Sequence, residues 1–183
     1  MRTRYSTCVG LPVLEDGTEE VLGTLSGILI HPDMGRIEGF FVRIAGFLKN
    51  EEEFVSSQDI VHWGMRIRVS HADALGPLEE RVRLHTLYEE DRPVLGQKIV
   101  AEGGAILGRC QDIQFETVTF RLEWLFPKKF WRWGLSVPVT AVIEVKPEAI
   151  IVRDTLLGED TVPAQSVLEK LAEAPVQRPL DPA

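Results

Sequence analysis

The side chains that most often carry chemistry are sparse and scattered in this chain. Its two cysteines, Cys8 and Cys110, lie in apolar-patterned segments, and neither has a histidine close by in the sequence. A thiol in such surroundings stays protonated and unreactive, so we expect both cysteines to be reduced and buried as small apolar residues. No histidine pair has i, i+4 spacing, and none has partner cysteines at a zinc-site separation. The pattern predicts no metal site and no cofactor. The histidines are His31, His62, His71 and His85.

Two further patterns that can indicate catalysis have simpler interpretations. The glycine-rich stretch 103–108 superficially resembles a phosphate-binding loop, but it has no lysine or serine at the required positions. It also lies within a hairpin pattern rather than between a strand and a helix, so we expect turn geometry there. The carboxylates are grouped as adjacent acids on turns, where they stay ionised and contribute solubility rather than a tuned acid–base pair. We therefore predict that the protein is not an enzyme.

One segment, residues 126–134, does suggest a function. It interleaves cations with aromatic rings on a chain whose formal net charge is -8 and whose pI is about 5.1. Such a mixture can anchor a protein partner, stack on nucleic-acid bases or sit at a lipid interface. Alternatively, the rings close the end of a barrel as a plug and the cations only solvate the loop. The candidate partner-binding residues are Lys128, Lys129, Phe130, Trp131, Arg132 and Trp133.

The elements that would position this segment come from an internal repeat. The pattern from Val13 to Ile30 recurs from Ile99 to about Ile113, with the apolar and glycine positions in step. Each copy reads as strand, glycine turn and strand. Gly17 and Gly103 are expected to reverse the chain, since glycine adopts positive φ without a Cβ clash. Inside each returning strand, a second glycine indicates a bulge or a sharp bend. These second glycines are Gly23 and Gly108.

The rest of the chain predicts short strands around two small cores. We expect one domain at 1–74 and a second at 92–160, with a solvated loop at 49–53 in the first. The intervening 75–91 reads as a connector, with at most one helical turn and an extended piece at 82–84. A helix is expected at 161–174, since apolar residues fall on one face there, followed by a frayed tail at 175–183.

The order of these features resembles the PRC-barrel domain family. The resemblance rests on an acidic-Gly turn, an apolar-Leu-Gly step, a second hairpin and the Val137-Pro138 step before a closing strand. It covers roughly residues 5–72 and 92–155. It implies an all-β fold of two tandem small PRC-type β-barrels, with a short connector and one C-terminal helix. Members of this family serve as assembly and docking platforms, so the resemblance says more about fold than about function.

The leading hypothesis is therefore a non-enzymatic interaction module, an adaptor or scaffold that binds an unidentified protein. The alternative is an RNA-processing or ribosome-assembly factor, acting on RNA or a ribonucleoprotein through residues 126–134. No segment approaches the roughly 20 apolar residues that a membrane span needs, and no signal peptide is evident, which favours a cytoplasmic location.

Overall fold

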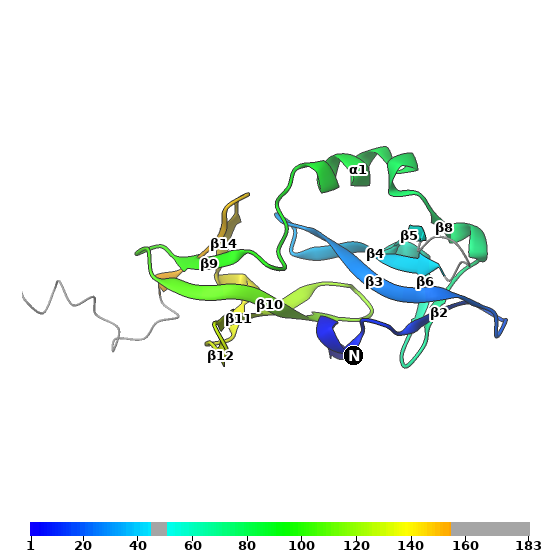
Figure 1. The fold of residues 1–183 in the computed structure, drawn as a ribbon, viewed down its shortest axis with the longest axis horizontal. Helices are drawn as coiled ribbons and strands as arrows, with labels where there is room; N and C mark the ends of the chain where they lie inside the picture. Colours follow the sequence, from blue (N-terminus) through cyan, green and yellow to red (C-terminus); the bar gives the residue numbers. More distant parts are fainter. Residues whose placement is uncertain (45–50, 155–183) are drawn as a thin grey trace, which may run out of the picture. The chain divides into compact units, whose positions relative to one another are not determined.

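The described part of the protein consists mainly of β-strands arranged in two sheets (Figure 1). The computed structural model describes residues 1–44 and 51–154, and Met1–Arg153 forms one compact unit. The prediction of an all-β fold is confirmed. The predicted helix at 161–174, the tail at 175–183 and the end of the second predicted domain lie outside the described residues. Among the described residues, no helix has the length and apolar character needed to cross a bilayer.

The first sheet has the strand order β6-β7-β2-β3-β4-β5-β8. β2 and β7 run parallel, and the other neighbouring strands run antiparallel. Fully buried residues from β3 and β4, among them Leu25, Ile37 and Phe40, form much of its apolar face. The strands are β2 (Pro12–Glu15), β3 (Val21–His31), β4 (Arg36–Ile44), β5 (Glu51–Ser56), β6 (Ile60–Trp63), β7 (Ile67–Val69) and β8 (Leu75–Gly76).

The second sheet has the order β12-β11-β10-β9-β15-β14, with β13 also paired to β11. β1, from the start of the chain, adds to it by pairing antiparallel with β10. The strands are β1 (Arg2–Arg4), β9 (Lys98–Ala101), β10 (Ile106–Glu116), β11 (Leu122–Lys129), β12 (Arg132–Trp133), β13 (Val137–Pro138), β14 (Val142–Val145) and β15 (Ala149–Val152). Short 3-10 helices join several strands: η1 (Tyr5–Thr7), η2 (Ser57–Asp59), η3 (Ala72–Ala74), η4 (Leu78–Glu80) and η5 (Val139–Ala141).

The two sheets repeat one strand order. The run β6-β7-β2-β3-β4-β5 in the first corresponds to β14-β15-β9-β10-β11-β13 in the second. The parallel pairing also matches, because Val13 lies opposite Ile67 and Ile99 lies opposite Ile150. The expectation that both halves share one topology is confirmed.

Both predicted bulges are present at the second glycines. β2 and β3 shift register beside Gly23, leaving Leu22 unpaired, and β9 and β10 shift beside Gly108, leaving Leu107 unpaired. A Cβ on Gly23 would lie 2.6 Å from the Arg43 carbonyl oxygen. A Cβ on Gly108 would lie 2.8 Å from the corresponding oxygen of Lys128. Glycine is required at both positions because the next strand passes too close for a side chain.

The first turns of the two repeats differ in one respect. Asp16 and Glu102 each donate a backbone hydrogen bond to the end of the closing strand, so Gly17 and Gly103 occupy corresponding positions. Gly17 has positive φ (75°), as expected. In the second turn the residue with positive φ is Gly104 (87°), one place beyond the expected Gly103. The second turn is one residue shorter, and this moves the left-handed residue along the chain.

Neither sheet closes into a barrel among the described residues. The hydrogen-bonded path of the first sheet runs from β6 to β8, and that of the second runs from β12 to β14. Strands at or near the ends of these paths are short: β8, β12 and β13 have two residues each. In β13, Pro138 has no backbone N–H to donate, which limits further pairing. The expected closure of two barrels is therefore not seen in the backbone pairing.

The segment expected to be an extended connector contains a helix instead. α1 spans Val82–Glu89, so the prediction of an extended piece at 82–84 is wrong. Leu84 is buried with Leu29, Phe54 and Leu78, and Leu87 packs against the same cluster. The i, i+3 spacing of Leu84 and Leu87 puts both on one face, and burial of that face stabilises a helix of low intrinsic preference.

The acidic loop expected at 49–53 is also partly wrong. Glu51, Glu52 and Glu53 belong to β5, and they pair with the last three residues of β4. Their side chains are exposed or partly exposed. Backbone pairing with β4 decides the structure here, since acidic side chains are tolerated on the solvent side of a strand.

The two sheets share an aromatic core. Phe40 and Trp63 of the first half contact Phe115 and Phe120 of the second, with ring centroids 5.5–6.3 Å apart. Backbone hydrogen bonds join Ile37 to Phe120 and Leu122 to Gly35. The division of the chain into two domains at 75–91 stays a prediction. The two sheets pack against each other through the aromatic rings that they share.

Candidate interaction surface

The segment singled out in the sequence forms a narrow hairpin at the end of the second sheet. Lys128 pairs with Trp133 and Lys129 with Arg132, leaving a two-residue turn of Phe130 and Trp131. We call residues 128–133 the aromatic hairpin. All six predicted partner-binding residues lie together in it.

The aromatic residues of this hairpin project into solvent. Phe130 is 84% exposed, Trp131 82% and Trp133 55%, and nearby Leu135 is 61% exposed. The plug alternative is therefore wrong for these three rings, because a plug would bury them. Leu135 was not among the predicted residues, and only its exposure in the structure adds it to the apolar surface.

The turn of the aromatic hairpin is strained. Phe130 has a φ of 54°, in the left-handed region that side chains other than glycine, asparagine and aspartate rarely adopt. Two-residue hairpin turns require positive φ at the first central position, where glycine is usual. A bulky ring is held there at a conformational cost, and backbone strain of this kind clusters at binding sites.

The cations of the hairpin have no acidic partners in the described part of the chain. Among the described residues, no carboxylate lies within ion-pair distance of Lys128, Lys129 or Arg132. The Lys128 ammonium lies 5.3 Å from the Trp133 ring centroid, close enough for a cation–π interaction. The hairpin is therefore a basic, aromatic projection on an acidic protein.

Arg4 joins β1 to the base of the hairpin. Its guanidinium lies 3.7 Å over the Phe126 ring and 6.0 Å from the Trp133 ring. The Ser6 backbone N–H and hydroxyl donate to the buried carboxylate of Asp112 at 2.9 and 2.6 Å. These contacts hold the start of the chain against the strands that carry the hairpin.

The remaining candidate chemistry is not assembled into a site. Among the described residues, no cluster of three histidine, cysteine or acidic side chains could hold a metal ion. Cys8 and Cys110 are both buried and unpaired, as the prediction of buried cysteines required. Burial raises the pKa of the Cys110 thiol to about 12, so the thiol is protonated and a poor nucleophile. Residues 103–105 lie in the turn between β9 and β10, and residues 106–108 begin β10, which confirms the hairpin interpretation.

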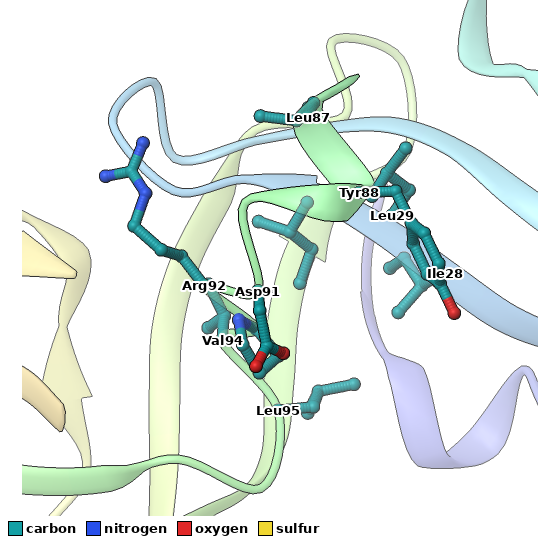
Figure 2. Close-up of a pocket in the computed structure, with 10 residues that line it drawn as sticks. Ile28, Leu29, Leu87, Tyr88, Asp91, Arg92, Val94 and Leu95 are labelled. Carbon is teal, nitrogen blue, oxygen red and sulfur yellow. The ribbon is translucent and has the colours of Figure 1, made fainter. Parts of the chain in front are cut away.

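A pocket of about 310 Å³ lies between β3, α1 and the segment that leads into the second half (Figure 2). Its walls include Ile28, Leu87 and Leu95. Figure 2 shows the Arg92 side chain pointing away from Ile28 and Leu95. The Arg92 guanidinium donates two hydrogen bonds to the Asp33 carboxylate, each 2.8 Å long. This contact lowers the pKa of the Asp33 carboxyl. The sequence prediction missed this pocket because it missed α1.

Comparison with models of known protein families gave no match, and a search of curated proteins found no related sequence.

Proposed function

We propose that this protein is a non-enzymatic interaction module that binds a protein partner through the aromatic hairpin. The observation that carries the proposal is the exposure of Phe130 and Trp131 at a strained two-residue turn. Water-exposed rings of this size gain most from burial against another surface. Because the hairpin is paired along both of its strands, little conformational freedom is lost when it binds.

The composition of the hairpin favours a protein surface as the target. Tryptophan and arginine are enriched among residues that dominate binding energy at protein interfaces. Lys128, Lys129 and Arg132 favour a partner with an acidic rim, because opposite charges at the rim speed association and select partners. The chain has a formal net charge of -8, which opposes non-specific binding to nucleic acid.

We also propose that each half is a divergent PRC-barrel-like domain, in a tandem pair that acts as an adaptor or scaffold. This kinship is supported by the shared strand order and by the matching bulges at Gly23 and Gly108. The open hydrogen-bonded paths differ from the closed barrels that this family resemblance implies. A scaffold role agrees with the scattered histidines and with the buried, protonated Cys110 thiol.

The alternative, an RNA-processing or ribosome-assembly factor, is favoured by the same unpaired cations. Lys128 and Lys129 lie beside rings on which bases could stack. Neutralisation of phosphates would make such binding strongly salt-dependent, whereas docking driven by apolar burial depends on salt much less.

The experiment compares partner recovery from a cell extract by the full chain and by its Trp131→Ala, Trp133→Ala variant. We expect this variant to stay folded and to lose its protein partner, with or without nuclease treatment. A matched control replaces Met65 and Val118 with alanine, since both are highly exposed apolar residues outside the hairpin. The control should keep the partner.

Two outcomes would contradict this function. Recovery that disappears on nuclease treatment and after Lys128→Glu with Lys129→Glu would favour the RNA alternative. Unchanged recovery by the tryptophan variant would show that the aromatic hairpin is not the docking element.

A further inference from the structure

The first half carries a small pocket that combines aromatic rings with two carboxylates, which we call the acidic pocket. It has a volume of about 190 Å³ and lies between β4, β5 and α1. The phenyl and phenol rings of Phe41, Phe54 and Tyr88 line it, together with the carboxylates Glu52 and Glu79. Leu78 and the imidazole of His85, which lies 3.7 Å from Glu89, complete the lining. All of its lining residues come from positions 41–88, so no part of the aromatic hairpin contributes to it.

The floor of the acidic pocket is rigid. Phe54 is fully buried and packs in one cluster with Leu78 and Leu84. The Phe41 ring meets Phe54 edge-on, with centroids 5.3 Å apart, and lies 5.9 Å from the Tyr88 ring. Tyr88 is 57% exposed, so it forms an open aromatic wall. The pocket presents ring faces and edges to a further aromatic side chain, an arrangement that favours aromatic pairing.

The rim of the acidic pocket is negatively charged. Glu52 accepts one hydrogen bond from Ser26, which leaves its second carboxylate oxygen available. Glu79 contributes a second carboxylate to the lining from η4. Among the described residues, neither carboxylate forms an ion pair, although Arg43 is the cross-strand partner of Glu52. The Arg81 guanidinium lies over the Phe54 ring, donates a hydrogen bond to the Ala74 carbonyl and faces Asp59 at 3.8 Å. The acidic rim therefore keeps its charge.

We propose that the aromatic hairpin of one copy of this protein docks into the acidic pocket of a second copy. The tip formed by Phe130 and Trp131 packs against the exposed Tyr88 ring at the mouth of the partner copy's pocket, and Lys128 and Lys129 face its Glu52 and Glu79. The proposal rests on the docking role given above to the hairpin. It commits to a second copy as the occupant because the chain carries both complementary surfaces, one basic and aromatic and one acidic and aromatic.

The geometry makes this contact heterologous. Each copy has one hairpin and one acidic pocket, so contacts add head to tail until they close into a ring or extend as a filament. A contact centred on one or two rings buries little area, which predicts weak, concentration-dependent association. Facing rim charges also predict that salt weakens it.

The test is sedimentation equilibrium of the full chain at protein concentrations from about 10 μM to about 1 mM, the range in which weak contacts form. The average mass of the wild type is expected to rise with concentration and to fall with added salt. A hairpin variant, Lys128→Glu with Lys129→Glu, and a pocket variant, Glu52→Lys with Glu79→Lys, should each stay monomeric.

Mixing the two variants gives the sharpest result. The hairpin variant keeps an intact pocket, the pocket variant keeps an intact hairpin, and the two substituted surfaces also carry opposite charges. The mixture should therefore associate with the two variants in alternation, although each variant alone stays monomeric. A chain with all four substitutions should associate again, because the charges are exchanged between the surfaces. Thermal melts of every variant check folding. Should the double pocket variant unfold, Glu79→Lys alone replaces it, since Glu79 is exposed in a short 3-10 helix.

A monomeric wild type across this range overturns the proposal, and so does a mixture that does not associate. Association that survives in either single-surface variant also overturns it. These failures are separate from failure of the proposed function. If the wild type is monomeric and the Trp131→Ala, Trp133→Ala variant still loses another protein partner, the hairpin docks to that partner and only self-association is wrong.

Discussion

The two halves of this protein place opposite chemistry at the same point of the same fold. In the first half, β4 ends with Arg43 and Ile44, which pair with Glu52 and Glu51. The corresponding strand of the second half, β11, ends with Lys128 and Lys129, which pair with Trp133 and Arg132. The glycine contacts show the correspondence, because Gly23 approaches Arg43 as Gly108 approaches Lys128. The strand that pairs with the end of β4 is therefore acidic, whereas the strand that pairs with the end of β11 is basic and aromatic.

This difference separates the residues that the backbone needs from those that are free to change. The bulge glycines and the parallel pairs recur because the strand geometry requires them. The residues at the end of the hairpin project beyond the paired sheet, so no packing requirement keeps them alike. Function is expected at such positions, where one copy has changed while the underlying register has not.

A second pair of corresponding positions explains why the start of the chain binds to the second half and not to the first. Gly27 pairs with Phe41, and Asp112 pairs with Phe126 in the same register. A Cβ on Gly27 would lie 2.9 Å from the Phe41 ring, whereas Asp112 holds Ser6 with two hydrogen bonds. The segment that includes β1 and η1 can therefore bind only the second half in this way.

The strongest test of the shared core is Phe115→Ala. Phe115 is fully buried and packs against the Phe40 and Trp63 rings of the other half, so its loss is expected to cost about 3–5 kcal/mol. We expect both halves to melt together at a lower temperature, measured by circular dichroism and tryptophan fluorescence. Two separate transitions in the wild type would show that the halves fold independently.

The next largest effect is expected from Gly108→Val. The added side chain would meet the Lys128 backbone at 2.8 Å, and the φ of 139° disfavours valine, so a loss of about 1–3 kcal/mol is expected. Gly23→Val should cost a similar amount, because the first half has the same close approach. Gly76→Val is the control, since no atom lies within 4 Å of its added Cβ. An unchanged melting temperature for Gly108→Val would mean that the bulge is not constrained.

A smaller, pH-dependent effect is expected at the turn between β10 and β11. The Glu116 carboxylate accepts hydrogen bonds from the Thr119 and Val118 backbone N–H groups and from the amino group of Met1. These hydrogen bonds lower the pKa of Glu116 from 4.5 to about 2, and the bond from the Thr119 backbone N–H has the largest effect. The stabilisation is present above pH 4.5 and is lost as the pH falls towards 2.

Glu116→Gln should therefore lower the melting temperature at neutral pH, and the difference from the wild type should shrink in acid. The corresponding residue of the first half is His31, which offers no carboxylate to its turn. A difference that stays constant with pH would show that the carboxylate charge does not stabilise the turn.

The smallest effect on stability is expected from the residues with the largest proposed effect on binding. Trp131→Ala with Trp133→Ala removes exposed rings, so the free energy of unfolding should change by no more than about 0.5 kcal/mol. Urea unfolding of both chains measures this change. A loss of several kcal/mol would instead place the two rings in the core, contrary to their exposure.

The sequence alone was enough to predict the glycine turns, the bulges and the strand-rich character of the chain. Glycine turns, bulge glycines and the alternation of apolar residues depend on sterics within a few residues, and these revealed both repeats and the all-β class. The basic and aromatic composition of residues 126–134 was visible for the same reason. The sequence could not show whether Trp131 is buried as a plug or exposed at a hairpin tip, because exposure depends on which distant strands cover a side chain.

Only the tertiary structure decided the remaining features. α1 forms because Leu84 and Leu87 find an apolar surface on β3 and β5, which local preference did not indicate. The sheets stay open because their short end strands pair on one side only. The aromatic core joins Phe40 to Phe115, which are 75 residues apart in the sequence. Long-range pairing and burial are properties of the assembled chain, since each needs a surface that no short stretch of sequence contains.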